Sequence, residues 1–324
     1  MYEKQNNSDV LSEYEIIEAI NTGGSDRKFF RVKKGNTTYI LIEDPNIDQY
    51  VKILNHLHQR GVGVPELIMT KGNRVIIEDL GRDSLYDFMR NKKYNWQRFY
   101  ELAIEELVKL QIDGYKDAPV NLYYDEDHIK WEQDYFKEFF LQQLCKIPED
   151  RLKETEDDFK ILIKDMVGGI KPIANFLMHR DYQSQNIYIK NNKIRIIDFQ
   201  SARIGPLTYD LASLLRDAYV DIDERTEEYL IFYYLDCLKK RGIEIPKEKF
   251  LRIYNLTAIQ RNMQALGAFV NLSLNKNKTQ FKKFIPRGIR LLNAELKRSN
   301  FLRIYDLTST IEQLFNCSDA QLPE

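Results

Sequence analysis

The sequence predicts an α+β fold with two lobes, a small one built on an antiparallel sheet plus a helix and a larger one that is mostly helical. With 324 residues, the chain exceeds what one compact core usually holds. Residues 14–80 read mostly as strands, whereas helical periodicity dominates from Ser84 onward and is interrupted only by an apolar hairpin at 187–198. We therefore divide the chain into residues 1–80 and residues 81–324.

The small lobe is expected to carry a five-stranded sheet and one helix. A turn at 21–26 and a tight turn at Gly35–Asn36 separate its first three strands. The helix spans Ile47–Arg60 and ends at Gly61. The strands that the pattern locates are Tyr14–Ile20, Phe29–Lys34, Thr37–Glu43 and, as the fifth, Val75–Ile77.

The large lobe is expected to be helical, apart from its hairpin. The candidate helices are Trp96–Gln111, Ile129–Leu144, Asp157–Val167, Thr208–Ala218, Glu224–Lys240 and Glu248–Asn271. In the hairpin, Asn191–Asn192 forms a two-residue turn that tolerates positive φ. With this register Ile189 faces Ile194 and Ile187 faces Ile196, which gives the hairpin one apolar side.

Composition and charge exclude several classes of protein. The net charge of −1 gives no reason to expect binding to nucleic acids or anionic membranes. The three cysteines, Cys145, Cys237 and Cys317, are widely spaced and indicate neither a disulfide framework nor a metal site. The first residues lack the apolar core of a signal peptide, and the most apolar run, Tyr229–Leu238, is too short to span a bilayer. We expect a cytoplasmic protein.

The strongest functional signal is a pair of carboxylates and an amide around the hairpin. The run from His179 to Asn186 reads H-R-D-Y-Q-S-Q-N, and Ile197-Asp198-Phe199 follows the second strand. In this spacing Asp181 can orient and deprotonate a substrate hydroxyl, while Asn186 and Asp198 can hold Mg²⁺ against nucleotide phosphates. The hairpin brings Asn186 back beside Asp198. The pattern therefore predicts an ATP- and Mg²⁺-dependent kinase.

These motifs resemble those of the aminoglycoside phosphotransferase and choline kinase superfamily, small-molecule kinases with a protein-kinase-like fold. The string from Asp198 to Leu215, D-F-Q-S-A-R-I-G-P-L-T-Y-D-L-A-S-L-L, is similar to that of bacterial cell-wall amino-sugar kinases, which phosphorylate N-acetylmuramate and N-acetylglucosamine at the anomeric position. Gln260–Gly267 and Ile285–Arg287 resemble the C-terminal pattern of that group. The resemblance implies an ATP-dependent sugar kinase, with residues 1–80 as the nucleotide-binding lobe and 81–324 as the catalytic and substrate lobe.

Candidate nucleotide-binding residues come from the small lobe. Gly23 and Gly24 let the backbone approach phosphates, and Gly24 and Ser25 belong to a Gly-Gly-Ser-x-Arg-x-Phe-x-Arg run that resembles the family. Arg27 and Arg31 either face phosphates or lie on a solvated face. At the junction between the lobes, backbone groups around Glu78 and Leu80 are expected to read the adenine edge.

Candidate substrate-binding residues are Gln183, Gln200 and Arg261, because a sugar or its carboxylate needs hydrogen-bond donors and a fork-like cation. The partners are thus expected to be ATP and a small sugar or amino sugar, with no nucleic acid or membrane. His179 is expected to organise the catalytic loop by hydrogen bonding. Asp210 is expected to cap a helix, with a contact to the catalytic loop as the alternative.

One departure from the broad kinase pattern leaves two rival interpretations. The third strand of kinase-like folds ends with a Lys that grips the phosphates, and here Glu43 stands at about that position. The absent Lys is the only support for a nucleotide-binding pseudokinase. The other rival is a kinase for aminoglycosides or another small alcohol. Polycationic antibiotics would require an acidic wall, for which the run Glu149–Asp158 is the sole candidate.

Overall fold

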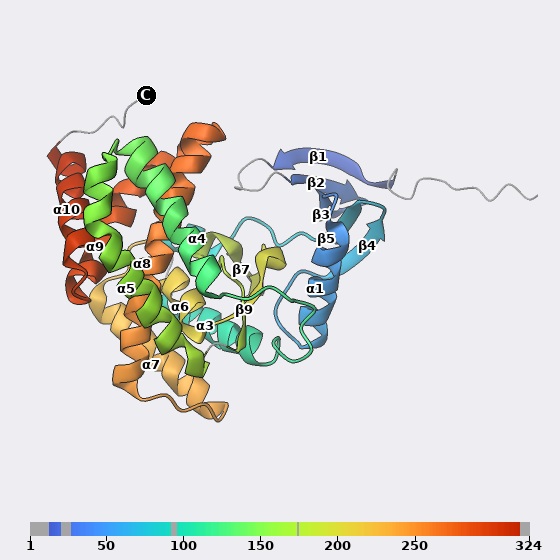
Figure 1. Ribbon diagram of the computed structural model, residues 1–324. Coiled ribbons are helices and arrows are strands. Elements are labelled where there is room, and N and C mark those ends of the chain that lie inside the picture. Colours follow the sequence, from blue (N-terminus) through green and yellow to red (C-terminus); the bar gives the residue numbers. More distant parts are fainter. Residues whose placement is uncertain (1–12, 21–26, 92–95, 174, 318–324) are drawn as a thin grey trace, which may run out of the picture.

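The computed structural model describes residues 13–20, 27–91, 96–173 and 175–317 of the chain. The N-terminal sheet lies at one end of the molecule and most of the helices at the other, with the β7–β8 region between them (Figure 1). This arrangement confirms the predicted α+β fold, with an antiparallel N-terminal sheet plus helix, a mostly helical remainder and a hairpin.

The N-terminal sheet is antiparallel and has five strands in the order β1-β2-β3-β5-β4. Helix α1 packs its apolar side, including Tyr50, Ile53 and Leu57, into the core. β4 is the strand that the sequence pattern did not locate. The elements are β1 (Glu15–Ile20), β2 (Lys28–Lys34), β3 (Thr37–Glu43), α1 (Ile47–Gln59), β4 (Leu67–Lys71) and β5 (Arg74–Glu78).

The remainder of the described chain is dominated by helices. Helix α7 coincides with its predicted range, whereas α5 begins eight residues before the predicted Asp157, and α9 and α10 were not predicted. The helices are α2 (Leu85–Arg90), α3 (Trp96–Ile112), α4 (Glu126–Phe136), α5 (Glu149–Ile170), α6 (Leu207–Leu215), α7 (Glu224–Lys240), α8 (Lys247–Val270), α9 (Ile285–Arg298) and α10 (Leu302–Cys317). A π-helical segment, Lys137–Leu144, continues α4 and accounts for the longer predicted helix.

Two small two-stranded sheets lie next to the segments that carry Asp181 and Asp198. Strands β7 (Ile187–Lys190) and β8 (Lys193–Ile196) pair in the predicted register, with Ile187 opposite Ile196 and Ile189 opposite Ile194. Asn191 and Asn192 adopt φ values of 53° and 57°, as the predicted turn requires. Strands β6 (Phe176–Met178) and β9 (Arg203–Gly205) pair antiparallel, so the segments before Asp181 and after Asp198 lie side by side.

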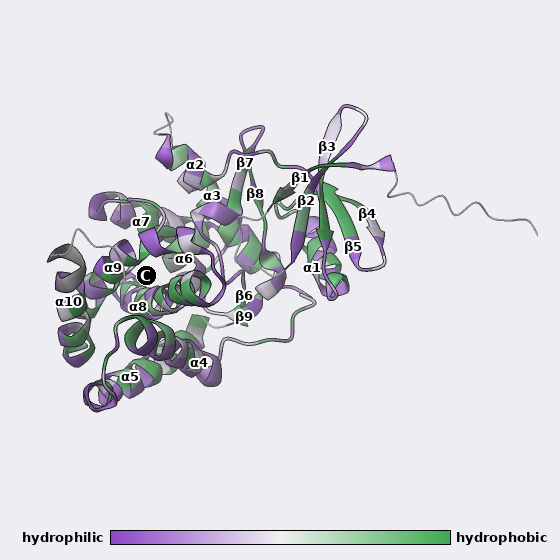
Figure 2. Ribbon diagram, turned by 90° about the horizontal axis from the view of Figure 1, so that it is seen from above, coloured by the Kyte–Doolittle hydropathy of each residue, from purple (hydrophilic) through white to green (hydrophobic). Residues whose placement is uncertain are grey.

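The loop after α1 joins the sheet to the hairpin through close backbone contact. The Ile196 N–H donates to the Gly63 carbonyl at 2.7 Å, and the Gly63 N–H donates to Glu106 Oε1 at 2.6 Å. A Cβ at Gly63 would lie 2.4 Å from the Ile194 carbonyl oxygen, so only glycine allows this approach. In addition, Tyr50 of α1 stacks on Phe199 with ring centroids 5.0 Å apart. One apolar core thus runs from α1 into the helices, and hydrophobic residues, coloured green, occur along both the N-terminal strands and the helices (Figure 2).

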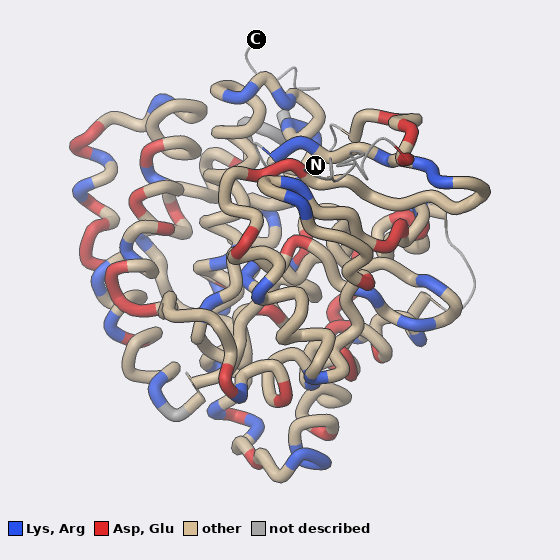
Figure 3. Tube along the Cα trace, turned by 90° about the vertical axis from the view of Figure 1, so that its right-hand side faces the viewer, with Lys and Arg blue, Asp and Glu red and all other residues tan. Residues whose placement is uncertain are grey.

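Basic and acidic residues are interspersed along the described trace (Figure 3), and the net charge of the chain is −1. Of the helices in the described part of the chain, none combines the length and the apolar character needed to cross a membrane.

Candidate active site

The catalytic loop, residues 179–186, is anchored by a buried carboxylate. Asp210 lies inside α6, where its side-chain oxygens accept the backbone N–H groups of His179 at 2.7 Å and Arg180 at 2.8 Å. Burial raises the Asp210 pKa to about 7, although these two donors oppose the rise. The expected capping role of Asp210 is wrong, because α6 begins at Leu207 after Pro206 and the carboxylate points to the loop. The alternative, a contact to the catalytic loop, is confirmed.

His179 is a buried, neutral connector between the two motifs. Its Nε2 lies 2.9 Å from the Ile197 carbonyl, and the Asp181 N–H donates to its Nδ1 at 3.2 Å. These partners require a proton on Nε2 and none on Nδ1. Burial lowers the His179 pKa to about 4, which keeps the ring uncharged near neutrality. The prediction that His179 organises the loop by hydrogen bonding is confirmed.

Asp181 and Asn186 are held in one compact turn. The Asn186 side-chain amide donates to the Asp181 carbonyl at 3.0 Å, and the Gln183 N–H donates to the same carbonyl at 2.9 Å. Because Nδ2 of Asn186 is used in this way, its Oδ1 is the atom available to a cation. The Asp181 side chain retains 31% of its exposure, so it remains accessible to a substrate.

The hairpin returns the chain to Asn186 and presents Asp198 beside it. The Ile197 N–H donates to the Asn186 carbonyl at 3.0 Å, immediately before Asp198. Asp198 adopts a left-handed conformation with φ 67° and ψ 32°, which turns its side chain out of the strand direction. Burial and the charge of Asp181 raise the Asp198 pKa above its usual range, despite a 2.6 Å hydrogen bond from Gln200 Nε2.

These donors fit a magnesium ion that also contacts phosphates. Mg²⁺ typically takes one or two protein carboxylates and completes its shell with substrate phosphates and water. Asn186 and Asp198 supply one amide oxygen and one carboxylate, and a cation would offset the unfavourable burial of Asp198. Among the described residues, no cluster of three or more His, Cys, Asp or Glu residues could hold a metal without such help.

Arg27 is a cation close to both the end of β3 and Asp198. Its guanidinium pairs with Asp44, just after β3, and lies 5.9 Å from the centre of the Tyr50 ring. Tyr50 stacks on Phe199, the neighbour of Asp198. The charge of Arg27 also opposes the rise of the Asp198 pKa, which places the two groups within electrostatic reach. Arg27, directly before β2, is thus a candidate cation for the nucleotide side of the site.

Arg31 is committed elsewhere, to the junction that follows β5. Its Nε donates to Asp79 Oδ2 at 2.7 Å, and its Nη1 contacts Glu18 at 2.5 Å. These pairs raise the Arg31 pKa and lower that of Asp79. The expectation that Arg31 faces phosphates is therefore not supported by its contacts. Gly24 and Ser25, the other candidates of this loop, lie outside the described residues.

The predicted adenine-reading segment is fixed by the hairpin. Lys190 of β7 donates to Glu78 Oε1 at 2.7 Å and to the Asp79 carbonyl at 2.8 Å. The Glu78 N–H donates to the Glu66 carbonyl at 2.9 Å, so it is not free to contact a base. Leu80 is buried, with 8% of its surface exposed.

The predicted substrate residues divide into two groups. Arg261 of α8 reaches the catalytic loop, where its Nη2 lies 3.1 Å from Gln183 Oε1 and 3.8 Å from Asp181 Oδ1. Ser213 of α6 supports the same guanidinium at 3.1 Å. Gln200, in contrast, donates to Asp198, and its contacts place it with the metal candidates.

Two groups that the sequence reasoning missed also shape the site. Asp217, after α6, accepts the Ser184 N–H at 2.8 Å and the Ser184 hydroxyl at 2.6 Å, which fixes the turn between Asp181 and Asn186. Arg180 lies 5.6 Å from the centre of the Trp131 ring on α4. Asp217 lies 33 residues from Ser184, and Arg180 lies 49 residues from Trp131. Contacts over such separations leave no local periodic signal in the sequence.

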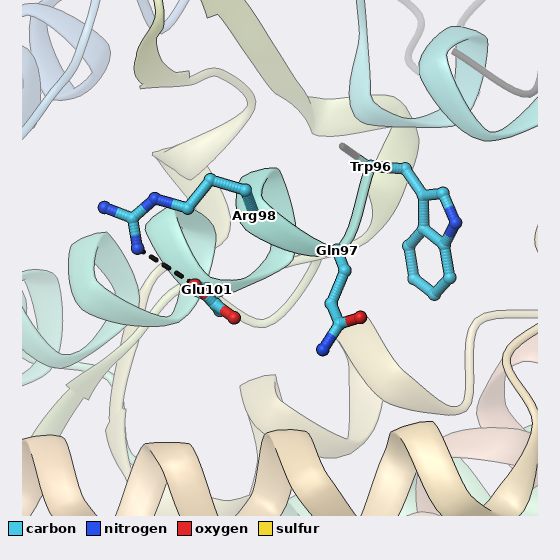
Figure 4. A pocket seen from close by; sticks show the side chains of 4 residues that line it. All are labelled: Trp96, Gln97, Arg98 and Glu101. Atoms are coloured by element: carbon cyan, nitrogen blue, oxygen red, sulfur yellow. Dashed lines mark hydrogen bonds and ion pairs between the residues drawn. The ribbon is translucent and has the colours of Figure 1, made fainter. Parts of the chain in front are cut away.

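A pocket of the surface lies away from these groups. It is lined by Trp96, Gln97, Arg98 and Glu101 at the start of α3, where Arg98 and Glu101 form an ion pair at 3.0 Å (Figure 4). None of the predicted site residues lines it, so it is separate from the catalytic constellation.

The fold and the Asp181–Asn186–Asp198 arrangement define a phosphotransferase, and comparison with known proteins agrees. The profile of the phosphotransferase enzyme family matches residues 16–244, more than half of the chain. The chain belongs to this family. It is a kinase, and ATP is its phosphate donor.

Curated relatives and solved structures extend the likeness over nearly the whole chain. It is 26% identical over 309 residues to an N-acetylmuramate/N-acetylglucosamine kinase of Pseudomonas aeruginosa, covering 92% of this chain and 89% of the relative. A protein of the same name from Neisseria meningitidis is 24% identical, over 84% and 83% of the two chains. A Plasmodium vivax ethanolamine kinase shares the fold with a TM-score of 0.62 at 18% identity, covering 88% and 83%. A choline kinase of Streptococcus pneumoniae gives 0.61 at 14% identity, covering 88% and 96%.

Proposed function

We propose that the protein transfers the γ-phosphate of ATP to the anomeric hydroxyl of an N-acetylated amino sugar and so produces a sugar 1-phosphate. The observation that carries this proposal is the placement of Arg261 and Gln183 beside Asp181. A guanidinium and an amide suit a neutral or acidic acceptor that offers hydroxyl and carboxylate oxygens. The names of the curated relatives support the same class of acceptor.

Asp181 is proposed as the general base. Its accessible carboxylate accepts the proton of the acceptor hydroxyl while that oxygen forms a bond to the γ-phosphorus. The bond between the γ-phosphorus and the bridging oxygen of ADP breaks, and ADP leaves with that electron pair. Asp210, His179 and Asp217 hold the loop from behind, so the position of Asp181 is set before substrate binds.

The nucleotide side of the site is proposed to be formed by Asn186, Asp198 and Arg27. Asn186 and Asp198 would hold Mg²⁺, which neutralises phosphate charge when bound. Arg27 takes the place of the absent strand-three Lys, and Gln200 orients the Asp198 carboxylate through its 2.6 Å hydrogen bond. The division into a nucleotide lobe at 1–80 and a catalytic lobe at 81–324 is part of this proposal.

The rival acceptor, a polycationic aminoglycoside, finds little support. The acidic run Glu149–Asp158 starts α5, and several of its carboxylates already have partners. Arg303 of α10 pairs with Asp157 at 2.9 Å, and Lys137 pairs with Glu156 at 3.2 Å. The paired carboxylates of this exposed helix thus contact neighbouring parts of the protein. The pseudokinase interpretation rests only on the absent strand-three Lys, and Arg27 is proposed to supply that cation.

An acceptor screen tests the proposal directly. ATP consumption is measured with N-acetylmuramate, N-acetylglucosamine, neutral hexoses and kanamycin, and phosphorus NMR locates the new phosphate. We expect turnover of the N-acetylated sugars and a phosphate on the anomeric carbon. Robust phosphorylation of kanamycin, or a product that carries the phosphate on another hydroxyl, would reject the proposal.

A further inference from the structure

Two arginines beside the catalytic loop have no role in the mechanism above. Arg180 precedes Asp181, and Arg203 begins β9, directly opposite Met178 in the β6–β9 pair. The pairing of these strands therefore brings the backbone of Arg203 close to the segment that carries Arg180, and the charge of Arg180 acts on Arg203. Arg180 retains 16% of its side-chain exposure, and Arg203 is likewise only partly buried.

Neither arginine is fully satisfied by the protein. Within the described part of the chain, the Nε atoms of Arg180 and Arg203 are buried and have no hydrogen-bond partner. Leaving a charged donor unpaired in a buried position is costly, so such atoms call for an explanation. The two cations also disfavour each other, because burial and the charge of Arg180 lower the Arg203 pKa below its usual range.

The nearest carboxylate offers Arg180 an opposite charge but no hydrogen bond to its Nε. Glu132 of α4 is fully buried and lies 4.0 Å from Arg180 Nε, beyond hydrogen-bond distance. Its oxygens accept instead from Tyr124 at 2.9 Å and from Tyr209 at 2.8 Å. Asp181 is reserved for the acceptor hydroxyl and also faces Arg261. Among the described residues, the Nε donors of both arginines therefore remain without a hydrogen-bond partner, and an anionic ligand can use them.

An exposed aromatic surface adjoins the two arginines. Trp131 lies under the Arg180 guanidinium, is 47% exposed, and stacks with His128 and Tyr135 at centroid distances of 5.3 Å each. Tyr123, 58% exposed, forms a bridge to Ile204, the neighbour of Arg203. A flat exposed indole next to cations suits a pyranose ring that carries an anionic substituent.

We propose that Arg180, which lies over Trp131, and Arg203 form a subsite for the carboxylate of an acidic amino sugar. This inference rests on the proposed function and goes further, because it assigns the discrimination between acidic and neutral acceptors to two named residues. N-acetylmuramate carries a lactyl carboxylate that N-acetylglucosamine lacks, so only the former gains the charge-assisted hydrogen bonds of the subsite.

The test compares three acceptors with the wild-type protein and with Arg203→Met. The acceptors are N-acetylmuramate, its neutral carboxamide and N-acetylglucosamine. In the wild type we expect the KM for N-acetylmuramate to be lower than that for the carboxamide by about tenfold or more. Arg203→Met should raise the KM for N-acetylmuramate by about 10- to 100-fold and change the other two by less than about threefold.

Matched controls separate this subsite from other roles. Arg252→Met removes an exposed arginine, paired with Asp165 on the surface, and should leave all three KM values unchanged. If Arg203→Met raised the KM for all three acceptors equally, or raised the KM for ATP, the proposed subsite would be overturned. Should that variant fail to fold, equal wild-type KM values for N-acetylmuramate and its carboxamide would overturn it equally. A wild-type protein that phosphorylates none of these sugars would reject the proposed function itself, and the subsite with it.

Discussion

The carboxylate of Asp210 accepts the backbone N–H of His179 at 2.7 Å, across 31 residues of sequence. A second bond, from the Arg180 N–H at 2.8 Å, makes Asp210 the anchor of the segment that carries Asp181. Arg180 has φ 79°, a conformation that a non-glycine residue adopts only when its surroundings enforce it. The anchor on α6 supplies this constraint and so places Asp181.

Replacing Asp210 by Asn should therefore impair catalysis more than nucleotide binding. The amide has the same volume but only one acceptor oxygen, and its NH₂ group opposes a backbone N–H. We expect kcat to fall by about 10- to 100-fold, as for the loss of a buried charge-assisted hydrogen bond. Steady-state kinetics with ATP titration provides the measurement. A loss confined to the KM for ATP would contradict the anchoring role.

Asp181→Asn should remove turnover and preserve nucleotide binding. In the proposed mechanism the carboxylate meets the acceptor and does not bind the nucleotide, and a general base contributes about 10²- to 10⁴-fold to the rate. Single-turnover phosphotransfer gives the rate, and calorimetry with Mg·ATP gives the affinity as the control. If the variant keeps more than about a tenth of the wild-type rate, Asp181 is not the base.

Asp198→Ala is expected to act on the nucleotide instead. Asp198 is the carboxylate partner of Asn186, and Mg²⁺ prefers carboxylate oxygen. We expect Mg·ATP affinity to fall sharply, whereas the weaker binding of ATP in excess EDTA should change little. Calorimetric titrations under both conditions separate these effects. Unchanged affinity for Mg·ATP would remove Asp198 from the metal site.

Arg27→Met should weaken ATP binding if Arg27 replaces the strand-three Lys. Charge-assisted hydrogen bonds to phosphates predict a rise of about 10- to 100-fold in the KM for ATP. Arg27→Lys should recover part of this loss because it retains the charge. The matched control is Arg74→Met, which breaks an exposed pair with Glu43 in the same sheet. An equal KM for ATP in Arg27→Met and Arg74→Met would exclude a role of Arg27 in binding phosphate.

His179 should make the stability of the protein depend on pH in acid. Its folded-state pKa, about 4, lies below the ordinary value of 6.5, so the unfolded chain binds the proton more readily. The stabilisation due to neutral His179 is complete above pH 6.5 and is lost as the pH falls toward 4. Between pH 8 and pH 5 the loss is about 2 kcal/mol.

Chemical unfolding of the wild type and His179→Gln at these two pH values isolates this contribution. The free energy of unfolding of the wild type should fall more steeply than that of the variant, which has no imidazole to titrate. Asp210 acts in the opposite direction, since its raised pKa of about 7 lowers stability as the pH rises from 4 to 7. The pH dependence of the wild-type free energy of unfolding is thus a poor test by itself. If the free energies of the wild type and His179→Gln changed in parallel with pH, His179 would not be buried as a neutral ring.

The sequence by itself determined the elements with a clear local periodicity and the spacing of the reactive groups, but it did not locate β4, β6, β9, α9 or α10. Strand β3 and helix α7 lie where their periodicities predict, and the hairpin register follows from the Asn191–Asn192 turn and the alternating isoleucines. These features depend on interactions between residues close in sequence, which a pattern records directly. The order of Asp181, Asn186 and Asp198 around that hairpin was sufficient to indicate a kinase.

Tertiary structure alone decided which side chains support that chemistry. The even spacing of Arg27 and Arg31 gave no choice between them, whereas packing pairs Arg31 with Asp79 and brings Arg27 toward Asp198. The sequence around Asp210 predicts a helix cap, yet its carboxylate accepts a hydrogen bond from the backbone of His179, 31 residues away. The cluster of Arg180, Arg203 and Trp131 comes from three separate elements. Such contacts depend on how helices and strands pack together, and no local periodicity encodes that packing.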